Sequence, residues 1–367
     1  MASTAAASGR RHSIRVRLLL LALLPLGIVL PALLAILAVW GGDYIDRLLV
    51  DRVRTDLAAA HGYYERVAEG VGRSVEALAG SARLAGVLAR SDGARQVVVD
   101  RLLGEARPGL KLDFLYFLDV DRDSAAVQAW PVLSDAAAGR ARTETDVFLA
   151  HQLALLDPRL AEQALTPLLA TANAAPDERA IEDRGLVLHA AAPVFDASGR
   201  VAGVLAGGVL LNKNLAFIDR LNEIIYPEGA LLLGSKGTAT LFLGDVRVAT
   251  NVRLFEGGRA IGTRVSAAVR GAVLDEGRTW LDRAFVVTDW YVSGYQPIVD
   301  SAGQRVGMLY VGFLEEPFAA AKRAGLAVVV GLFALAMLAA GLFATLWARR
   351  VFRPIERMHA TMSAIEQ

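Results

Sequence analysis

Two long runs of residues without a single charge constrain this chain more than any other feature of its sequence. The first run extends from Leu18 to Trp40 and the second from Ala324 to Ala348. At about 1.5 Å per residue, a helix over either run is long enough to cross a hydrocarbon core of about 30 Å. Buried helices of soluble proteins seldom contain so many consecutive apolar residues. We therefore expect two transmembrane helices, at residues 18–40 and 324–348.

The first run must also be compared with a secretory signal peptide. The apolar region of a signal peptide is about 7–15 residues long and ends at a cleavage site of small residues. Here the run is longer and ends in the sequence VWGG at residues 39–42, which is a poor cleavage site. Pro25 and Pro31 would bend a helix here, and membrane helices tolerate such bends. We expect an uncleaved anchor.

Basic residues flank both runs on one side. Arg10, Arg11, Arg15 and Arg17 precede the first run, and Arg349, Arg350, Arg353 and Arg357 follow the second. On the opposite side of the second run stand only Lys322 and Arg323. Cytoplasmic flanks carry the excess of Lys and Arg, so residues 1–17 and 349–367 are predicted to be cytoplasmic. Residues 41–321 would then lie outside the cell membrane, in the periplasm or at the exterior of a bacterium.

The composition argues against several classes of function. The formal net charge is only +1, so no overall positive field indicates nucleic acid as a partner. The chain has no cysteine, which excludes disulfides, thiolate metal sites and cysteine nucleophiles. Its five histidines lack metal-ligand spacing, and the sequence has no nucleophile-elbow motif. We expect no catalytic residue, metal or cofactor in this chain.

The region between the two runs reads as mixed helix and strand. Apolar residues spaced by three or four predict a long helix over residues 43–90, and a shorter helix should end at Pro108. Further helices are expected at 145–156, 158–171 and 266–276, the last with Ser266 as its N-cap. The predicted strands are 111–120, 125–133, 184–195, 201–211, 239–243, 246–252, 279–287, 289–299 and 305–314.

One internal repeat organises these strands. The eighteen residues from Pro193, PVFDASGRVAGVLAGGVL, align without a gap on those from Pro297, PIVDSAGQRVGMLYVGFL. The shared Asp and Gly predict a hairpin turn in each copy, and Gly203 and Gly307 would let the backbones approach closely in the returning strand. We therefore expect two copies of one module in series, a distal module at about 110–211 and a proximal module at about 230–316.

This order of parts resembles the double Cache sensors of bacterial histidine kinases and chemoreceptors. The resemblance is carried by the two hairpins, by GVLAGGVLLNKNLAFIDRL at 203–221, and by ATLFLGDVRVATNV at 239–252 with GTRVS at 262–266. It is closest to the type in which a Cache_3 module is fused to a Cache_2 module. It implies an α+β fold in which a long N-terminal helix and two PAS-like antiparallel sheets in series are flanked by transmembrane helices.

The tail resembles the beginning of a HAMP domain. After the second run, Ile355, Met358, Met362 and Ile365 are spaced by three, four and three residues, as in a coiled-coil seam. The resemblance implies a homodimeric receptor in contact with membrane lipid, with an extracytoplasmic small molecule as ligand. Its signal would pass through HAMP to a histidine kinase transmitter, absent from residues 1–367, and on to a response regulator. A chemotaxis receptor is the alternative, and a membrane-anchored periplasmic enzyme is disfavoured.

Two groups of side chains are the candidates for ligand binding. In the proximal module Arg283, Trp290, Tyr291 and Tyr295 combine a cation with aromatic walls, which suits a small carboxylate or amine. Strand alternation puts Tyr291 and Tyr295 on one face. Residues 288–291, TDWY, lack the Arg of the Arg-x-Trp-Tyr pattern in amino-acid-sensing Cache domains, so amino-acid sensing is not expected. Tyr116, Trp130 and His189 are the distal candidates; packing in the core is the alternative role for both groups.

Overall fold

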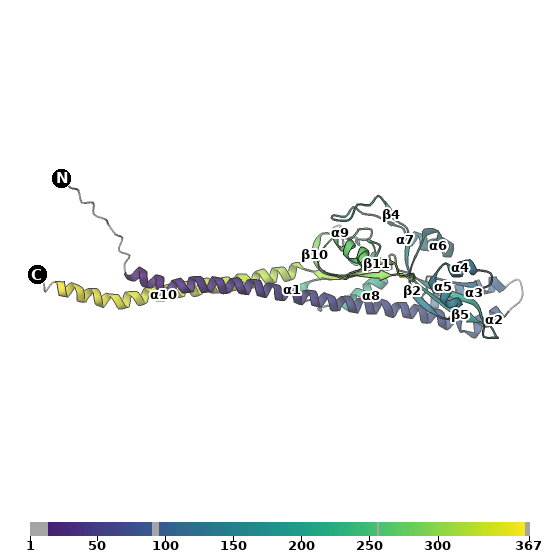
Figure 1. Cartoon of the computed structure of the whole chain (residues 1–367), viewed down its shortest axis with the longest axis horizontal. Helices are drawn as coiled ribbons and strands as arrows, with labels where there is room; N and C mark the ends of the chain where they lie inside the picture. Colours follow the sequence, from purple (N-terminus) through teal and green to yellow (C-terminus); the bar gives the residue numbers. More distant parts are fainter. Residues whose placement is uncertain (1–13, 90–94, 255–256, 364–367) are drawn as a thin grey trace. The chain divides into compact units, whose positions relative to one another are not determined.

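The computed structural model describes residues 14–89, 95–254 and 257–363, and it divides into two compact units (Figure 1). One unit consists of the described part of residues 1–48 together with 318–363, and we call it the helical unit. The other, Leu49–Pro317, contains all the strands, and we call it the globular unit. Two helices, α1 (Ile14–Ala79) and α10 (Glu316–Ser363), contribute residues to both units.

The helical unit contains the two apolar runs. Both α1 and α10 are long and apolar enough to cross a membrane, with mean hydropathies of 1.9 and 2.6 in their most apolar windows. Just beyond the runs, Lys322 Nζ lies 3.4 Å from both carboxylate oxygens of Asp46. Helix α10 continues to Ser363 through the segment predicted to begin a HAMP domain. The side chains of that seam, Ile355, Met358, Met362 and Ile365, lie outside the described residues, as do Arg10 and Arg11.

Within the globular unit, α1 is an amphipathic core helix. Its buried positions Val53, Leu57, Ala60, Tyr64, Val71 and Val75 follow one another at helical spacing. The helix ends at Ala79, and the Ser81 side chain caps α2 (Ala82–Leu88) by accepting a hydrogen bond from Leu84 N at 3.2 Å. The predicted long helix is thus two helices, and α3 (Arg95–Gly109) ends where Pro108 indicated. The predicted break at 91–93 lies outside the described residues.

The distal sheet has the order β1-β6-β5-β2, with every pair antiparallel. Its strands are β1 (Phe114–Asp119), β2 (Arg142–Phe148), β5 (Gly185–Phe195) and β6 (Val201–Leu210). Four helices accompany this sheet: α4 (Ser124–Gln128), α5 (Pro131–Ala137), α6 (Ala150–Leu156) and α7 (Pro158–Ala164). The segment between α7 and β5, residues 165–184, contains the short strand pair β3 (Thr166–Pro167) and β4 (Ile181–Glu182), and we call this segment the excursion.

Two sequence expectations for this sheet were wrong. Residues 125–133 do not pair with β1 but form α4 and the start of α5, where Pro131 takes the first helical turn and Val132 and Leu133 are buried. Residues 145–148 belong to β2 rather than to a helix. Both errors have one cause. The partner of β1 is β6, about ninety residues away, and a local pattern cannot specify so distant a pairing.

The proximal sheet has the order β8-β7-β11-β10-β9 and is also antiparallel. Its strands are β7 (Gly237–Leu243), β8 (Val246–Thr250), β9 (Trp280–Val286), β10 (Asp289–Val299) and β11 (Arg305–Leu314). Helix α8 (Leu215–Ile225) precedes it, with a 3-10 turn at Leu232–Gly234. The predicted helix from Ser266 is confirmed as α9 (Ala267–Arg270), which continues as a π-helical turn at Gly271–Asp275.

The internal repeat is confirmed in the backbone. Strands β5–β6 and β10–β11 are the central hairpins of two separate sheets, and the chain registers match: Pro193 faces Val204, and Pro297 faces Met308. Each hairpin has a register shift two residues after its proline. The turns are alike as well, since Asp196 and Asp300 each accept two backbone N–H groups within their turn. One supersecondary unit therefore occurs twice.

The repeated glycines allow the close approach that the sequence predicted. A Cβ atom added at Gly307 would lie 2.1 Å from Phe242 O, and one at Gly203 would lie 2.6 Å from Leu118 O. We expect Gly307→Ala to lower the free energy of unfolding by about 1–3 kcal/mol, because the neighbouring backbone must move. Gly104→Ala, in α3 with open space around it, should be neutral or stabilising by up to about 1 kcal/mol. Denaturant unfolding of both variants measures this, and equal effects would contradict it.

Two contacts tie the distal and proximal sheets together inside the globular unit. The β10–β11 turn lies against β2, where Ser301 N donates to Thr145 O at 3.2 Å. The excursion between α7 and β5 lies against the segment that precedes α9, where Leu169 N donates to Gly262 O at 2.9 Å. Gly262 has φ +86°, and an added Cβ there would lie 2.1 Å from Pro167 O. A side chain at this position would therefore separate the two segments.

Candidate functional site

The distal candidates come together in one buried cluster on the distal sheet. His189 on β5 is fully buried, with its Nε2 atom 3.3 Å from the Tyr116 hydroxyl on β1. The Trp130 ring meets the His189 ring edge to face at 5.9 Å, and the Phe148 ring does so at 5.1 Å. Burial raises the pKa of the Tyr116 phenol. We call Tyr116, Trp130, Phe148 and His189 the distal aromatic cluster.

Asp146 connects this cluster to the proximal sheet. One of its carboxylate oxygens lies 2.9 Å from His189 Nδ1, and the other accepts from Ser301 Oγ at 2.6 Å and from Ser301 N at 3.3 Å. Asp146 is 1% exposed. An ionised carboxylate only accepts hydrogen bonds. When Asp146 is ionised, the proton of this hydrogen bond is therefore on Nδ1 of His189. Hydrogen bonds to Asp146 therefore connect the His189 ring with the turn that leads into β11.

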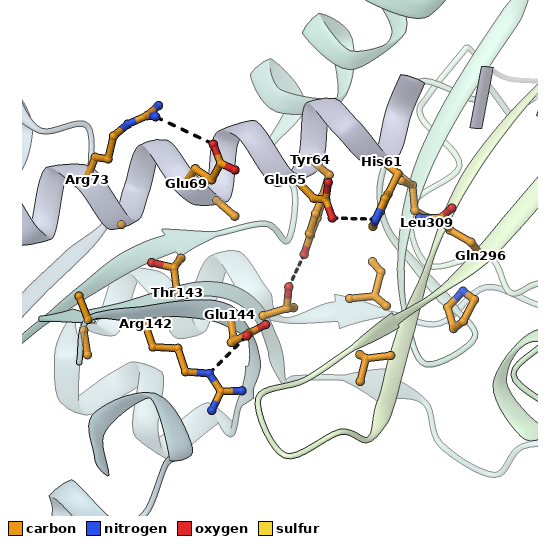
Figure 2. Close-up of a pocket in the computed structure, with 18 of the residues that line it drawn as sticks. His61, Tyr64, Glu65, Glu69, Arg73, Arg142, Thr143, Glu144, Gln296 and Leu309 are labelled. Carbon is orange, nitrogen blue, oxygen red and sulfur yellow. Dashed lines mark hydrogen bonds and ion pairs between the residues drawn. The ribbon is translucent and has the colours of Figure 1, made fainter. Parts of the chain in front are cut away.

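A pocket of about 720 Å³ lies between α1, the distal strand β2 and the proximal strand β10 (Figure 2). We call it the junction pocket. It is lined by His61, Tyr64, Glu65, Ala68, Glu69, Gly72, Arg73, Glu76, Ala141, Arg142, Thr143, Glu144, Thr145, Ala191, Gln296, Pro297, Ile298, Val299 and Leu309. The Tyr64 hydroxyl is 2.6 Å from Thr145 Oγ1, which joins α1 to β2 at the back of the pocket.

Most charged groups around the junction pocket pair with one another. His61 Nε2 lies 2.9 Å from Glu65, and Arg142 Nε lies 3.3 Å from Glu144; Figure 2 shows both pairs along with Arg73 and Glu69. Glu76 also lines the pocket, so carboxylates outnumber the arginines Arg73 and Arg142 there, and the lining does not favour an anionic ligand. The junction pocket lies where the distal and proximal sheets meet.

A second pocket, of about 730 Å³, opens on the proximal sheet, and we call it the proximal pocket. It is lined by Asp219, Lys236, Gly237, Thr238, Asn251, Val252, Arg253, Leu254, Arg259, Val286, Thr288, Asp289 and Tyr291. Thr238 and Tyr291 reach it from the sheet, and the Thr238 hydroxyl is 3.1 Å from that of Tyr310. The proximal pocket therefore opens onto the face of the sheet that carries Tyr310.

The same face of the proximal sheet also buries a guanidinium. Arg247 on β8 is 2% exposed, and its Cζ atom lies 5.0 Å from the centre of the Phe242 ring. Its Nη1 donates to Thr263 Oγ1, whereas Nε has no partner. Burial lowers the pKa of Arg247, and the neighbouring phenols of Tyr295, Tyr310 and Tyr291 oppose that shift.

The proximal candidates predicted from the sequence do not form one site. Arg283 faces Val292 across the β9–β10 pair, while Tyr291 faces Ala284, so Arg283 lies on the opposite face of the sheet from Tyr291 and Tyr295. Its Nε donates to Glu315 at 2.5 Å. Trp290 is 56% exposed and packs against Phe285. Tyr295 is buried against Tyr310, with the ring centres 4.6 Å apart.

Sequence reasoning missed Arg247 and Asp146. A signal for Arg247 existed, because it is the charged residue in the middle of VRVAT, a strand in which every residue is buried. Asp146 gave no such signal, since its segment was assigned to a helix.

Comparisons with solved structures find several to which this chain is similar. The chain is similar to the periplasmic domain of Vibrio cholerae LuxQ, at 14% identity over 71% of this chain and 98% of that one, with a TM-score of 0.39. It is also similar to the ligand-binding domain of the Campylobacter jejuni chemoreceptor Tlp3 in complex with L-valine, at 9% identity over 75% and 94% of the two chains, with a TM-score of 0.37. No curated protein matches the chain.

The family comparison is specific to one part of the chain. Residues 209–324 match the family model described as single Cache domain 3. The match begins at the end of β6 and includes α8, the whole proximal sheet, α9 and the first residues of α10. The resemblance to Cache sensors predicted from the sequence is therefore confirmed, and the family match that supports it covers residues 209–324.

Proposed function

We propose that this chain is the receptor part of a bacterial transmembrane signalling protein that binds a small molecule outside the cytoplasm. One observation carries the proposal. The last strand of the Cache domain, β11, ends at Leu314, and α10 begins two residues later at Glu316 and becomes the second apolar run. The sensing sheet and a candidate membrane helix therefore share one almost uninterrupted backbone path.

The first apolar run supports the same role. Helix α1 contains that run and, further along, the buried residues Val53, Leu57 and Val75 of the globular unit. A ligand that binds one arrangement of the globular unit more tightly than another shifts the population toward it, and only by that difference in affinity. Both membrane helices begin or end in the globular unit, so such a shift has two routes to the cytoplasm.

The finer assignments rest on the sequence pattern of the tail. Residues 349–367 begin a HAMP domain, the receptor is a homodimer in contact with membrane lipid, and its output is a histidine kinase that acts on a response regulator. A chemotaxis receptor is the second candidate, because it has the same parts up to residue 367. The reading frame that encodes the residues after Gln367 distinguishes the two, since one alternative requires a phospho-accepting helix and the other requires long methylation helices.

Cysteine labelling tests the topology that this function requires. The chain has no cysteine, so single substitutions report without background. Ala197→Cys lies in the exposed β5–β6 turn, and Ser363→Cys lies in the predicted cytoplasmic tail. A membrane-impermeant maleimide should label Ala197→Cys in intact spheroplasts and Ser363→Cys only after lysis. Labelling of Ser363→Cys from outside, or protection of Ala197→Cys until lysis, would contradict an extracytoplasmic sensor.

A further inference from the structure

Arg247 carries a positive charge into the core of the proximal sheet without a negative partner. It forms no ion pair with any residue in the described part of the chain, although it is 2% exposed. A guanidinium has five N–H donors, and among the described groups only Thr263 Oγ1 accepts from its side chain. Buried charges in proteins are generally paired, because removing an ion from water is costly. Within residues 14–89, 95–254 and 257–363, no carboxylate compensates this cation.

The unused donors form one edge of the guanidinium. The bond to Thr263 uses Nη1 and Nε has no partner among the described residues. Nε and Nη2 project parallel N–H groups in the plane of the guanidinium, along one edge. That edge matches the two oxygens of a carboxylate in a bidentate pair. An amine would bring a second positive charge beside the first, so the site selects against cations.

The surroundings favour an organic anion. Across the strands, Phe242 faces both Arg247 and Met308, and Tyr310 faces both Tyr295 and Thr240, so these side chains share one face of the sheet. The face is lined by aromatic and apolar groups, with phenol and threonine hydroxyls between them. The indole N–H of Trp280, which faces Tyr295 from β9, is buried and also without a partner among the described residues.

The proximal pocket opens on the same face of the sheet, and Arg247 itself lies behind its lining residues rather than among them. The pocket's volume of about 730 Å³ is in the range of sites for small organic ligands, and its lining residues Thr238 and Tyr291 lie on the same face as Arg247. The Thr238 hydroxyl contacts the Tyr310 hydroxyl at 3.1 Å, which connects the pocket wall to the tyrosines around Arg247.

We propose that the proximal Cache domain binds a small organic carboxylate, whose two oxygens pair with the Nε and Nη2 edge of Arg247 behind the proximal pocket. The proposal rests on the receptor function proposed above and specifies the chemical class of its ligand. It also places the site in the sheet whose last strand leads into α10. Tyr291, Tyr295 and Tyr310 act as the aromatic and hydroxyl walls of the site, and Arg283 takes no part in it.

The test uses the full chain in lipid nanodiscs and pairs of compounds that differ only in charge. Acetate, pyruvate, benzoate and succinate are each compared with the corresponding neutral amide, and a panel of primary amines is included, with the midpoint of thermal unfolding as the readout. At least one carboxylate should raise the midpoint, and its amide should not. Arg247→Met should weaken the affinity for that carboxylate by about tenfold or more, because the charge-assisted pair is lost.

The unfolding midpoint of Arg247→Met without ligand is a second measurement, and it distinguishes a ligand-binding arginine from a purely structural one. Since Arg247→Met removes an unpaired buried charge and retains the apolar stem, its unfolding midpoint without ligand should equal or exceed that of the wild type. Arg278→Met, which removes an exposed arginine far along the chain, is the control and should change neither value. A variant Arg247→Met that is less stable and binds the carboxylate as the wild type does would overturn the proposal.

Other outcomes separate this inference from the proposed function. If only amines raise the midpoint, or if Arg253→Met at the pocket rim abolishes the carboxylate effect while Arg247→Met does not, the Arg247 site is wrong and the receptor function stands. If no compound of any class binds, the inference fails together with the proposal that this domain is a small-molecule receptor.

Discussion

Replacing Asp146 by alanine is expected to lower the free energy of unfolding by about 3–5 kcal/mol. The carboxylate accepts hydrogen bonds from His189 Nδ1, Ser301 Oγ and Ser301 N, and it is 1% exposed. Alanine leaves His189 Nδ1 and Ser301 Oγ without this acceptor, at a cost of about 1–3 kcal/mol for each one that water cannot reach, whereas Ser301 N still donates to Thr145 O. It also removes the bridge between the distal aromatic cluster and the turn before β11. Denaturant unfolding followed by tryptophan fluorescence measures the loss.

Two further variants make this prediction specific. Asp146→Asn has nearly the same shape, retains one oxygen for Ser301, and presents an amide N–H to His189 Nδ1, which can accept it in the other tautomer. It should therefore lose clearly less stability than Asp146→Ala. Asp100→Ala, an exposed carboxylate hydrogen-bonded only to Gln96 on its own helix, should stay within about 0.5 kcal/mol of the wild type. If Asp146→Ala behaves like Asp100→Ala, the connection between the sheets contributes nothing to stability.

The hydrogen bonds between Asp146 and Ser301 also predict an energetic coupling between the two sheets, which a double-mutant cycle measures. Ser301→Ala removes one hydroxyl and should cost about 0.5–1.5 kcal/mol by itself. Because Ser301 and Asp146 share hydrogen bonds, the effects of Ser301→Ala and Asp146→Ala should not add in the double variant. Additive effects would mean that the turn and the distal cluster do not act on each other through Asp146.

Strands β9, β10 and β11 of the proximal sheet could be predicted from the sequence because they are consecutive, whereas the pairing of β7 with β11 joins distant segments. Strands β9, β10 and β11 follow one another through short turns, and each alternates residues toward the two faces, so local pattern and pairing coincide. The repeat strengthened this prediction, since the same Asp and Gly turn occurs in β5–β6. In the distal sheet the edge strands β1 and β2 pair with strands that are distant in sequence, and there the prediction of 125–133 as a strand was wrong.

The candidate site was predicted less completely for a different reason. Side-chain alternation puts Tyr291 and Tyr295 on one face, but it cannot say that Arg283 faces the other side, because this depends on the register between β9 and β10. Tyr116, Trp130 and His189 are the distal candidates of the sequence, and the pairing of β1 with β6 and of β6 with β5 brings Tyr116 and His189 together. Trp130 joins them from the start of α5. The chemistry of a residue is visible in the sequence, whereas its partners depend on long-range pairing.

A network of charges holds the excursion between α7 and β5 against the proximal sheet. Arg264 Nη2 donates to Asp245 at 2.6 Å and lies 3.3 Å from Asp177, and its Nη1 donates to Ala175 O at 2.7 Å. The Arg264 and Asp245 side chains are 11% and 4% exposed, so water screens them little. Arg179 extends the network from Asp177 to Glu182. Segments far apart in the sequence are therefore joined here by ion pairs rather than by a continuous sheet.

Arg264→Met should consequently lower the free energy of unfolding by about 3–5 kcal/mol, because Asp245 stays buried with only the more distant Arg179 and Arg270 beside it. Arg305→Met, an arginine hydrogen-bonded to backbone carbonyls at the surface, is the matched control and should lose about 1 kcal/mol or less. A loss as small as that of Arg305→Met would show that the network does not fix the excursion. Limited proteolysis gives an independent measure, since cleavage within residues 168–180 should become faster in Arg264→Met alone.

The same network predicts how stability depends on pH. The Arg179 side chain hydrogen-bonded to Asp177 lowers the pKa of that carboxyl from its ordinary value of 3.8 to about 2 in the folded protein. A folded-state pKa below the unfolded one means that the contribution is complete above about pH 4 and disappears as the pH falls through about 2. The free energy of unfolding of the wild type should therefore decrease across this window, and Arg179→Met, which removes the main cause of the shift, should decrease less steeply. A steeper decrease in Arg179→Met would show that other carboxylates, and not this pair, determine the acid limit of the fold.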